Sequence, residues 1–268
     1  MKMKKLLSLS LIVSMMVLSL AGCGKKEEAK EGDLLSKIKE QGYFTVAMEG
    51  QWAPWTYHDE NDNLTGFEVD VAKAVADKLG VEARFVEGEW DGLLAGVQGG
   101  RYDLMANGVG VTDERKESYE FSDSYVFNRT VLIVRNDNED IKSLEDLKGK
   151  TTCNSANSTY QTTAESYGAT VKDLETLDQT LEEVTAGRVD ATLNAEVSFN
   201  DYLKAHPDAP LKVAAVDPDV EKCAMIMPKG ENSYALRDAV NEALKELEKE
   251  GKLAEISIKY FGLDITKE

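Results

Sequence analysis

The segment TGFEVDVAKAVADKLG, residues 65–80, decides the fold class of this chain. Thr65 is followed three residues later by Glu68, which has the form of a capping box at a helix start. Apolar side chains then recur at every fourth position, and Gly80 provides a stop. The recurring residues are Phe67, Val71, Val75 and Leu79. The segment is therefore predicted to be an amphipathic helix.

Strand-like segments lie on both sides of this helix. Residues 43–48 and 84–86 are predicted strands, and residues 102–106 form a third. Between the last two, a second helix is marked by Trp90, Leu93, Leu94 and Val97 and ends at a glycine pair. The order strand, helix, strand, helix, strand predicts a mainly parallel sheet with helices on both faces.

The same alternation restarts after an extended apolar segment, residues 130–134. The predicted elements of this second half are helices at 143–147, 158–167, 181–185, 199–203 and 234–247 and strands at 151–154, 189–193 and 222–227. We therefore expect an α/β chain of two lobes, each a mainly parallel sheet flanked by helices. Two hinge crossovers, at 130–134 and 224–227, would join the lobes around a ligand cleft.

The N-terminus has the form of a lipoprotein signal. A basic start, Met1 to Lys5, precedes an apolar block at residues 6–20 and the ending LAGC. A membrane-spanning helix is the alternative, but it needs about 20 apolar residues, and this block is shorter and contains several Ser. We predict a signal peptide at 1–22 and lipid attachment at Cys23, which would anchor the chain to a bacterial cell membrane. A flexible charged tether is expected to extend over residues 23–40.

The charge balance excludes nucleic acid as a partner. Removal of residues 1–22 takes away three Lys and leaves 28 basic and 49 acidic side chains, a net charge of −21 on 246 residues. Nucleic-acid binding needs a basic surface that neutralises phosphates. An acidic surface instead keeps a protein soluble and favours a monomer, which we expect here.

Cysteine and histidine leave little for metal or redox chemistry. Cys153 and Cys223 are far apart in sequence, and both a disulfide and two buried thiols remain open. The only histidines are His58 and His206, too few for a zinc site or a histidine-based triad. We expect no cofactor and no metal.

Residues 107–125, NGVGVTDERKESYEFSDSY, carry the clearest candidate site. Gly108 and Gly110 allow close approach of the backbone to a ligand, and Thr112 is predicted to cap a short helix. Arg115 follows, and a guanidinium matches a carboxylate through two parallel N–H groups. A solvated surface position is the alternative for a lone Arg.

This segment resembles the extracytoplasmic solute-binding proteins of ABC importers, polar amino-acid type, through TDERKESYEFSDSY at 112–125. Further matches are EGQWAPWTYHDENDNLTGFEVDVAKAVADKLG at 49–80, SLEDLKGK at 143–150, AGRVDATL at 186–193 and KLAEISIKYFG at 252–262. The regions around Glu49 and Asn107 are most similar to cystine-type binders. The resemblance implies a periplasmic-binding-protein fold, with lobe 1 at 41–131 and 226–268 and lobe 2 at 132–225.

The resemblance also implies a function without catalysis. The chain would capture a polar amino acid, such as cystine or a related zwitterion, and deliver it to ABC permease and ATPase subunits. Two alternatives remain on the same scaffold. One is a dehydratase-like enzyme for a small carboxylic acid, in which a carboxylate-gripping Arg and a nearby Glu would suffice for proton transfer. Against it, Glu49 and Glu196 are the only acid–base candidates. The other is a ligand sensor that docks on a receptor.

Carried over residue by residue, the resemblance assigns Arg115 to the ligand α-carboxylate. Thr112 and the backbone from Gly108 to Val111 would add contacts, although Gly110 lacks the hydroxyl that the family often has there. Trp52 would pack on ligand carbons, with a core position as the alternative, and Trp90 either does the same or only packs its helix. Glu49 would read the ligand side chain unless it is a solvated loop acid.

In lobe 2, Asn157, Ser158 and Thr159 stand where the family has an anion-binding loop at a helix start, unless they form only a cap. Asn157 can adopt the positive φ that glycine would supply. The family usually has an Asp for the ligand ammonium where this chain has Ala195. Either Asn194 or Glu196 would replace it.

Overall fold

The computed structural model describes residues 32–268. The predicted signal peptide and the lipid site at Cys23 lie outside this part. Among residues 32–268, no helix has both the length and the apolar character that crossing a bilayer requires.

The predicted tether at 23–40 is too long, because its last part is a helix. Helix α2 (Leu34–Gln41) is capped by Asp33, whose carboxylate accepts a hydrogen bond from Ser36 N at 3.0 Å. Leu34 and Ile38 are buried in the core on one side of this helix. The charged residues before it, 23–31, lie outside the described part.

The first lobe is built around a five-stranded sheet in the order β4-β1-β5-β12-β6. Strand β1 pairs in parallel with β4 and β5, as the predicted alternation required. Strand β12 runs antiparallel to β5 and β6, so the complete sheet is mixed. The strands are β1 (Tyr43–Met48), β4 (Glu82–Glu87), β5 (Leu104–Met105), β6 (Tyr119–Phe121) and β12 (Ile226–Pro228).

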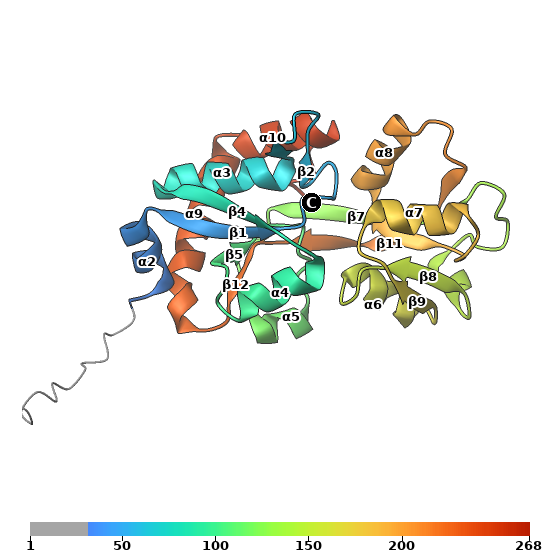
Figure 1. Ribbon diagram of the computed structural model, residues 1–268, viewed down its shortest axis with the longest axis horizontal. Coiled ribbons are helices and arrows are strands. Elements are labelled where there is room, and N and C mark those ends of the chain that lie inside the picture. The colour runs from blue at the N-terminus through green and yellow to red at the C-terminus, as the bar shows by residue number, and fades with distance from the viewer. Residues whose placement is uncertain (1–31) are drawn as a thin grey trace, which may run out of the picture. The chain divides into compact units, whose positions relative to one another are not determined.

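Helices cover both faces of this sheet (Figure 1). One face packs against α3, α9 and α10, and the other against α4. Side chains of β1 alternate accordingly, with Val46 and Met48 in the first core and Ala47 in the second. The helices are α3 (Phe67–Leu79), α4 (Trp90–Gln98), α5 (Asp113–Ser118), α9 (Tyr234–Lys249) and α10 (Lys252–Phe261).

Helix α3 confirms the predicted period but not the predicted capping box. Gly66 is the N-cap and makes no side-chain cap bond. Its φ is 129°, and a Cβ there would collide with the carbonyl oxygen of Trp55, so glycine is required. Glu68 is fully buried and does not fold back on the helix start. Tertiary contacts have therefore replaced the local cap.

The second lobe differs from the prediction of a mainly parallel sheet. Strand β7 (Val126–Arg135) lies between β10 (Thr192–Ala195) and β11 (Leu211–Cys223), and both pairings are antiparallel. Strand β7 runs into this lobe and β11 runs back out of it (Figure 1), so these two neighbouring strands are antiparallel. Parallel pairing is limited to β8 (Thr151–Asn154) with β9 (Thr170–Asp173) and one bridge from Thr152 to Ala191.

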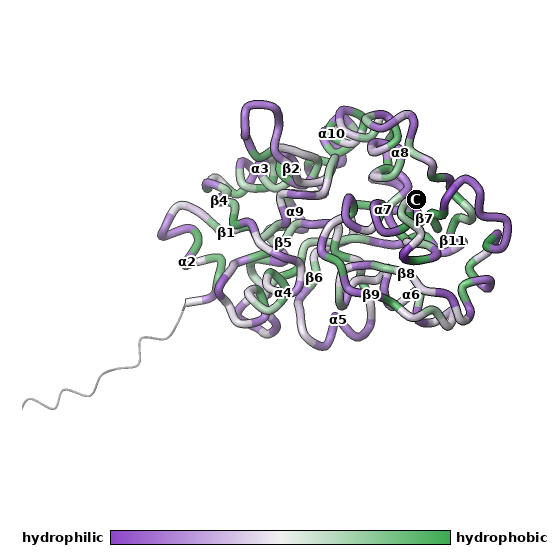
Figure 2. The backbone as a smooth tube through the Cα atoms, turned by 45° about the vertical axis from the view of Figure 1, so that its right-hand side comes forward, coloured by the Kyte–Doolittle hydropathy of each residue, from purple (hydrophilic) through white to green (hydrophobic). Residues whose placement is uncertain are grey.

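Four helices surround these strands, and the predicted elements at 143–147, 158–167 and 199–203 all have counterparts among them. They are η1 (Leu144–Leu147), α6 (Thr159–Ser166), α7 (Leu177–Thr185) and α8 (Glu196–Ala205). The remaining short elements are the β2–β3 hairpin (Tyr57–His58 and Leu64–Thr65) and η2 (Glu231–Ser233). The loop of that hairpin is strongly hydrophilic (Figure 2).

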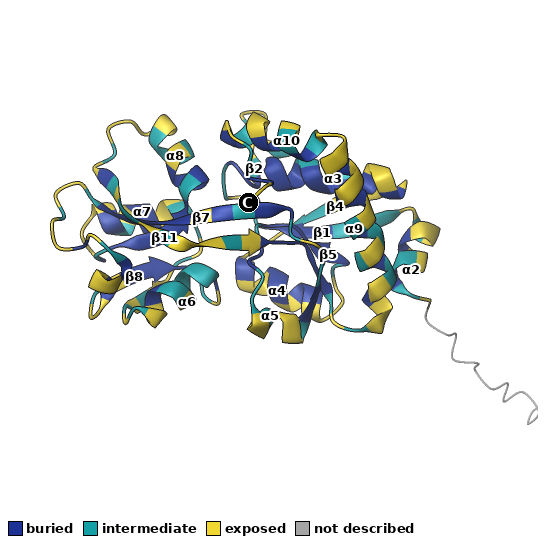
Figure 3. Ribbon diagram, turned by 180° about the vertical axis from the view of Figure 1, so that it is seen from behind, coloured by how far each residue is buried: buried dark blue, intermediate teal, exposed yellow. Residues whose placement is uncertain are grey.

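Burial follows the layers. Strands β1 and β7 are largely buried, whereas exposed residues lie on the outer faces of the helices (Figure 3). Cys153 and Cys223 are both buried, free thiols, which decides between the two alternatives left by the sequence. Burial raises the pKa of the Cys153 thiol to about 12, so it stays protonated at neutral pH.

Candidate functional site

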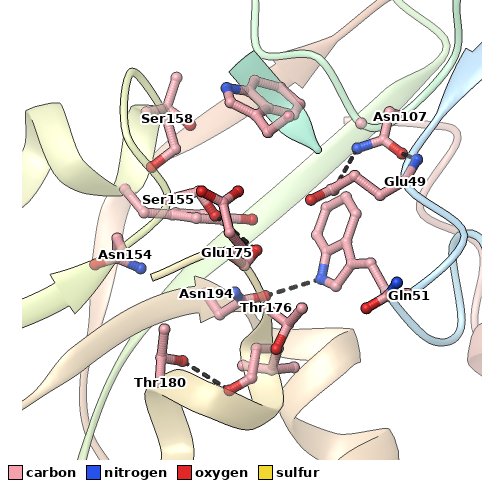
Figure 4. Close-up of a pocket in the computed structure, with 16 residues that line it drawn as sticks. Glu49, Gln51, Asn107, Asn154, Ser155, Ser158, Glu175, Thr176, Thr180 and Asn194 are labelled. Carbon is pink, nitrogen blue, oxygen red and sulfur yellow. Dashed lines mark hydrogen bonds between the residues drawn. The ribbon is translucent and has the colours of Figure 1, made fainter. Parts of the chain in front are cut away.

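A cavity lies between the two lobes, with about 50 Å³ of space that a water-sized sphere can enter. Figure 4 shows side chains from both lobes turned toward it. The lining residues are Glu49, Gln51, Trp52, Trp90, Asn107 and Gly108 from the first lobe and Asn154, Ser155, Ser158, Thr159, Tyr160, Glu175, Thr176, Leu177, Thr180 and Asn194 from the second.

Aromatic rings form part of the first-lobe wall. The Trp52 ring stacks on the buried Trp55 ring with centroids 4.9 Å apart and planes at 12°. Trp52 Nε1 donates to Asn194 Oδ1 at 3.2 Å, a hydrogen bond between the lobes (Figure 4). Trp90 is 7% exposed, and its Nε1 has no hydrogen-bond partner among the described residues. Both predicted tryptophans therefore line the cavity.

Glycine is required at position 108. Gly108 has a φ of 57°, and an added Cβ would lie 3.0 Å from Cζ3 of Trp52. Its N–H donates to Glu68 Oε1 at 2.6 Å, and the Tyr125 hydroxyl contacts Glu68 Oε2 at 2.5 Å. Burial raises the pKa of Glu68 to about 7, and both hydrogen bonds oppose that rise. A buried carboxyl thus holds the loop that carries Gly108.

Glu49 lies at the end of β1 and is held by Asn107. Asn107 Nδ2 donates to Glu49 Oε2 at 2.6 Å, and Glu49 N donates to Asn107 Oδ1 at 2.9 Å. Burial raises the pKa of the Glu49 carboxyl to about 7, the Asn107 bond opposes this rise, and the charge of Glu175 adds to it. The sequence prediction placed Glu49 correctly at the cleft but did not assign Asn107.

Small polar residues form the second-lobe wall. Ser158 caps α6 by accepting from Gln161 N at 3.1 Å. Asn154 is 2% exposed and donates to the Leu193 carbonyl at 2.7 Å, while its Oδ1 has no hydrogen-bond partner among the described residues. Ser155 and Glu175 follow the ends of β8 and β9. The sequence reading missed them, although the carboxyl ends of parallel strands were the signal that could have found them.

Arg115 does not line the cavity directly. Its guanidinium donates to the Gly110 carbonyl at 2.9 Å and to the Asn157 carbonyl at 2.8 Å, and it lies 5.3 Å from the centroid of the Trp90 ring. Arg115 therefore connects the lobes beside Trp90. Its role as carboxylate ligand stays a prediction.

Two local predictions around Arg115 are confirmed. Thr112 caps α5 by accepting from Arg115 N at 3.1 Å. Asn157 has a φ of 56°, the left-handed conformation expected in place of glycine. Local side-chain chemistry was sufficient for both, because each depends on residues adjacent in sequence.

Glu221, on β11, was not found from the sequence. Its Oε1 accepts from Thr159 Oγ1 at 2.6 Å, and its Oε2 accepts from Asn128 Nδ2 at 3.1 Å. A Cβ at Gly110 would collide with Glu221 Oε1. The Glu221 carboxylate, from a strand distant in sequence, thus occupies the space that a side chain at position 110 would fill. Burial raises the pKa of Glu221, and the Thr159 and Asn128 bonds oppose the rise.

The structure separates the two candidates that flank Ala195. Asn194 lines the cavity, whereas Glu196 is not among the lining residues. Glu196 instead lies 3.4 Å from Arg129 in an ion pair. Ala195 itself is fully buried in β10. The arrangement brings Asn194 to the cavity and leaves Glu196 outside it.

The sequence matches a family of known proteins. The family model for bacterial extracellular solute-binding proteins, family 3, matches residues 44–263. The L-cystine-binding protein TcyA of Bacillus subtilis (strain 168) is 40% identical over 269 residues, which is 98% of this chain and 99% of that protein.

Two solved structures are similar to this chain over most of its length. The L-cystine solute receptor of Neisseria gonorrhoeae in the unliganded open conformation is 38% identical and covers 88% of this chain and 100% of its own, with a TM-score of 0.59. An ancestral arginine-binding protein bound to arginine is 34% identical and covers 82% of this chain and 99% of its own, with a TM-score of 0.76.

Proposed function

Because this chain belongs to family 3 of the bacterial extracellular solute-binding proteins, we propose that it captures a polar amino acid in its interlobe cavity and delivers it to an ABC permease. The family predicted from the motifs is confirmed. The chain is a solute-binding protein of an amino-acid ABC transporter, not an enzyme. The observation that carries the proposal is the cavity lined by both lobes.

The ligand that we propose is L-cystine or a related zwitterion. Support comes from the relative TcyA, which is named for L-cystine, and from a wall that combines aromatic and polar groups. In this proposal Trp52 packs on the ligand carbons, Asn194 accepts from the ligand ammonium, and Ser158 and Thr159 present N–H groups at the start of α6.

Arg115 is the proposed partner of the ligand α-carboxylate. In the structure its two donors are held by the carbonyls of Gly110 and Asn157, one in each lobe. A carboxylate is a stronger acceptor for a guanidinium than a neutral carbonyl. We propose that the ligand carboxylate takes over part of this bonding, with Thr112 and the Gly108 loop beside it.

Closure needs no chemical step. We propose lobe 1 at residues 41–131 and 226–268, lobe 2 at 132–225, and hinge crossovers at 130–134 and 224–227. Hydrogen bonds from Trp52 to Asn194 and from Asn157 Nδ2 to Asp91 at 3.0 Å join the lobes. A ligand that contacts both lobes binds the closed state more tightly and so shifts the population toward it.

A melting-shift screen tests the function. The purified full chain would be heated with L-cystine and with each common amino acid, and L-cystine is expected to give the largest rise in Tm. Arg115→Ala serves as the binding-deficient control. Absence of any shift with all amino acids would contradict amino-acid capture.

Anchoring is the second part of the proposal. The chain would be attached to the bacterial cell membrane through lipidated Cys23, with permease and ATPase subunits as its partners. Cys23→Ala should move the protein from the membrane fraction to the soluble fraction. Retention of the variant in the membrane fraction would contradict lipid attachment.

A further inference from the structure

The cavity contains two carboxylates and no cationic side chain. Glu49 comes from the first lobe and Glu175 from the second, and the lining includes no Lys, Arg or His. The Arg115 guanidinium lies beside Trp90, outside the lining, and is already bonded to two carbonyls. Closing the lobes therefore brings negative charges together without a protein counter-charge in the cavity.

Several hydrogen-bond acceptors at this part of the cavity lack a donor. Asn107 bonds only one Glu49 oxygen, Oε2, and the Glu175 carboxylate has no hydrogen-bond or ion-pair partner in the described part of the chain. Figure 4 shows the side chains of Glu49 and Glu175 turned toward the same space. Asn154, which also lines the cavity, has an unpaired buried Oδ1. Each of these atoms can accept an N–H donor.

Electrostatics supports a cation between the lobes. The charge of Glu175 raises the pKa of Glu49, so the two carboxylates interact across the cavity. The pKa of Glu175 is also raised, by partial burial and then by the charges of Glu89 and Asp91. Like charges that approach on closure repel, and a cation between them converts that repulsion into attraction.

We propose that Glu175, together with Glu49, selects ligands that carry a second ammonium group in addition to the α-ammonium. This inference rests on the proposed amino-acid capture and names the ligand class within it. A ligand with one ammonium leaves the two carboxylates uncompensated and so closes the lobes less well. Glu175 contributes only when the lobes are close, because it belongs to the second lobe and Glu49 to the first.

The test uses two pairs of probes that differ at the distal ammonium. The first pair is L-cystine and the mixed disulfide of cysteine with 3-mercaptopropionate. The second pair is L-lysine and L-norleucine. Calorimetry of the full chain would give a Kd for each probe. In the pair that the wild-type chain binds, the probe with two ammonium groups should bind about ten-fold more tightly, as for a charge-assisted contact.

Glu175→Gln should reduce this ten-fold ratio to about one while the probe with one ammonium keeps its Kd. Glu182→Gln is the matched control, because it removes one negative charge from the exposed surface of the neighbouring helix α7. Its ratio should stay at the wild-type value.

Three results would overturn the inference. They are equal binding of both probes of a pair by the wild-type chain, an unchanged ratio in Glu175→Gln, and tighter binding of every probe by that variant. If the wild-type chain binds no amino acid at all, the proposed function itself fails, and that result is distinct from the other three.

Discussion

The two walls of the cavity are built in different ways. In the first-lobe wall, the Trp52 ring rests on Trp55, Glu49 is bonded twice to Asn107, and the Gly108 loop is tied to Glu68. In the second-lobe wall, small polar residues follow strand ends and cap helices. The first wall is ordered within its own lobe, so it can hold the ligand body before closure. The second wall supplies polar contacts that form when the lobes close.

The largest expected effect is at the contact between the walls. Arg115→Ala removes both carbonyl bonds and the proposed carboxylate contact, so ligand affinity should fall by at least about 100-fold, as when a buried charge pair is broken. Ligand-induced thermal stabilisation should then disappear. Arg115→Lys keeps the charge but loses the two-pronged geometry and should retain only part of the affinity.

An unchanged melting shift in Arg115→Ala would remove this residue from the site. The two walls would then be joined by the remaining interlobe hydrogen bonds, such as those from Trp52 to Asn194 and from Trp55 to Ser198.

The next effect tests the first wall. Trp52→Ala removes a stacked ring and the bond to Asn194, and we expect a loss of affinity of about 30-fold, or about 2 kcal/mol. Trp52→Phe keeps a ring over Trp55 but loses the indole N–H, so it should lose less. Kd values of both variants, measured by calorimetry, separate the contribution of the ring from that of the hydrogen bond. Equal losses would mean that the hydrogen bond, and not the ring, is the main contact.

A pH experiment tests Glu68, the buried carboxyl that holds the Gly108 loop of the first-lobe wall. The pKa of Glu68 is raised to about 7 in the folded chain, against an ordinary value of 4.5, so the folded state holds a proton that the unfolded state releases. Folding stability should therefore fall by about 3 kcal/mol as pH rises from about 4.5 to about 7, and it should change no further above that. Urea unfolding at pH 5 and pH 8 measures this.

The matched variant for that experiment is Glu68→Gln, which keeps an acceptor for Gly108 N but cannot titrate. Its stability should depend less on pH than that of the wild-type chain over the same window. If the two pH dependences coincide, Glu68 is already ionised at pH 5 in the folded state.

The smallest effect is expected in the second wall. Ser158→Ala removes the cap of α6 and should lower stability by about 1 kcal/mol while weakening ligand binding by only a few-fold. Thermal unfolding and calorimetry on one preparation separate the two effects. A loss of affinity as large as that of Trp52→Ala would show that the second wall dominates binding.

Local sequence patterns predicted the elements that depend on neighbours along the chain. The four-residue spacing from Phe67 to Leu79 gave α3, Thr112 identified the start of α5, and the turn preference of Asn157 gave its positive φ. The family motifs assigned Trp52 and Glu49 to the ligand cleft, and both residues line the cavity in the structure. Periodicity and capping could not identify Glu175, Asn154 or Glu221, because each acts on residues far from it in sequence.

The sequence by itself determined the α/β alternation, the family and most of the first-lobe wall, because these follow from side-chain periodicity and short motifs. Only the tertiary structure decided that β7, β10 and β11 are antiparallel, that Gly110 faces the Glu221 carboxylate, and that Asn194 and not Glu196 reaches the cavity. Each of these depends on which strands the hinge brings together. That pairing is set by long-range packing, on which the local order of residues carries little information.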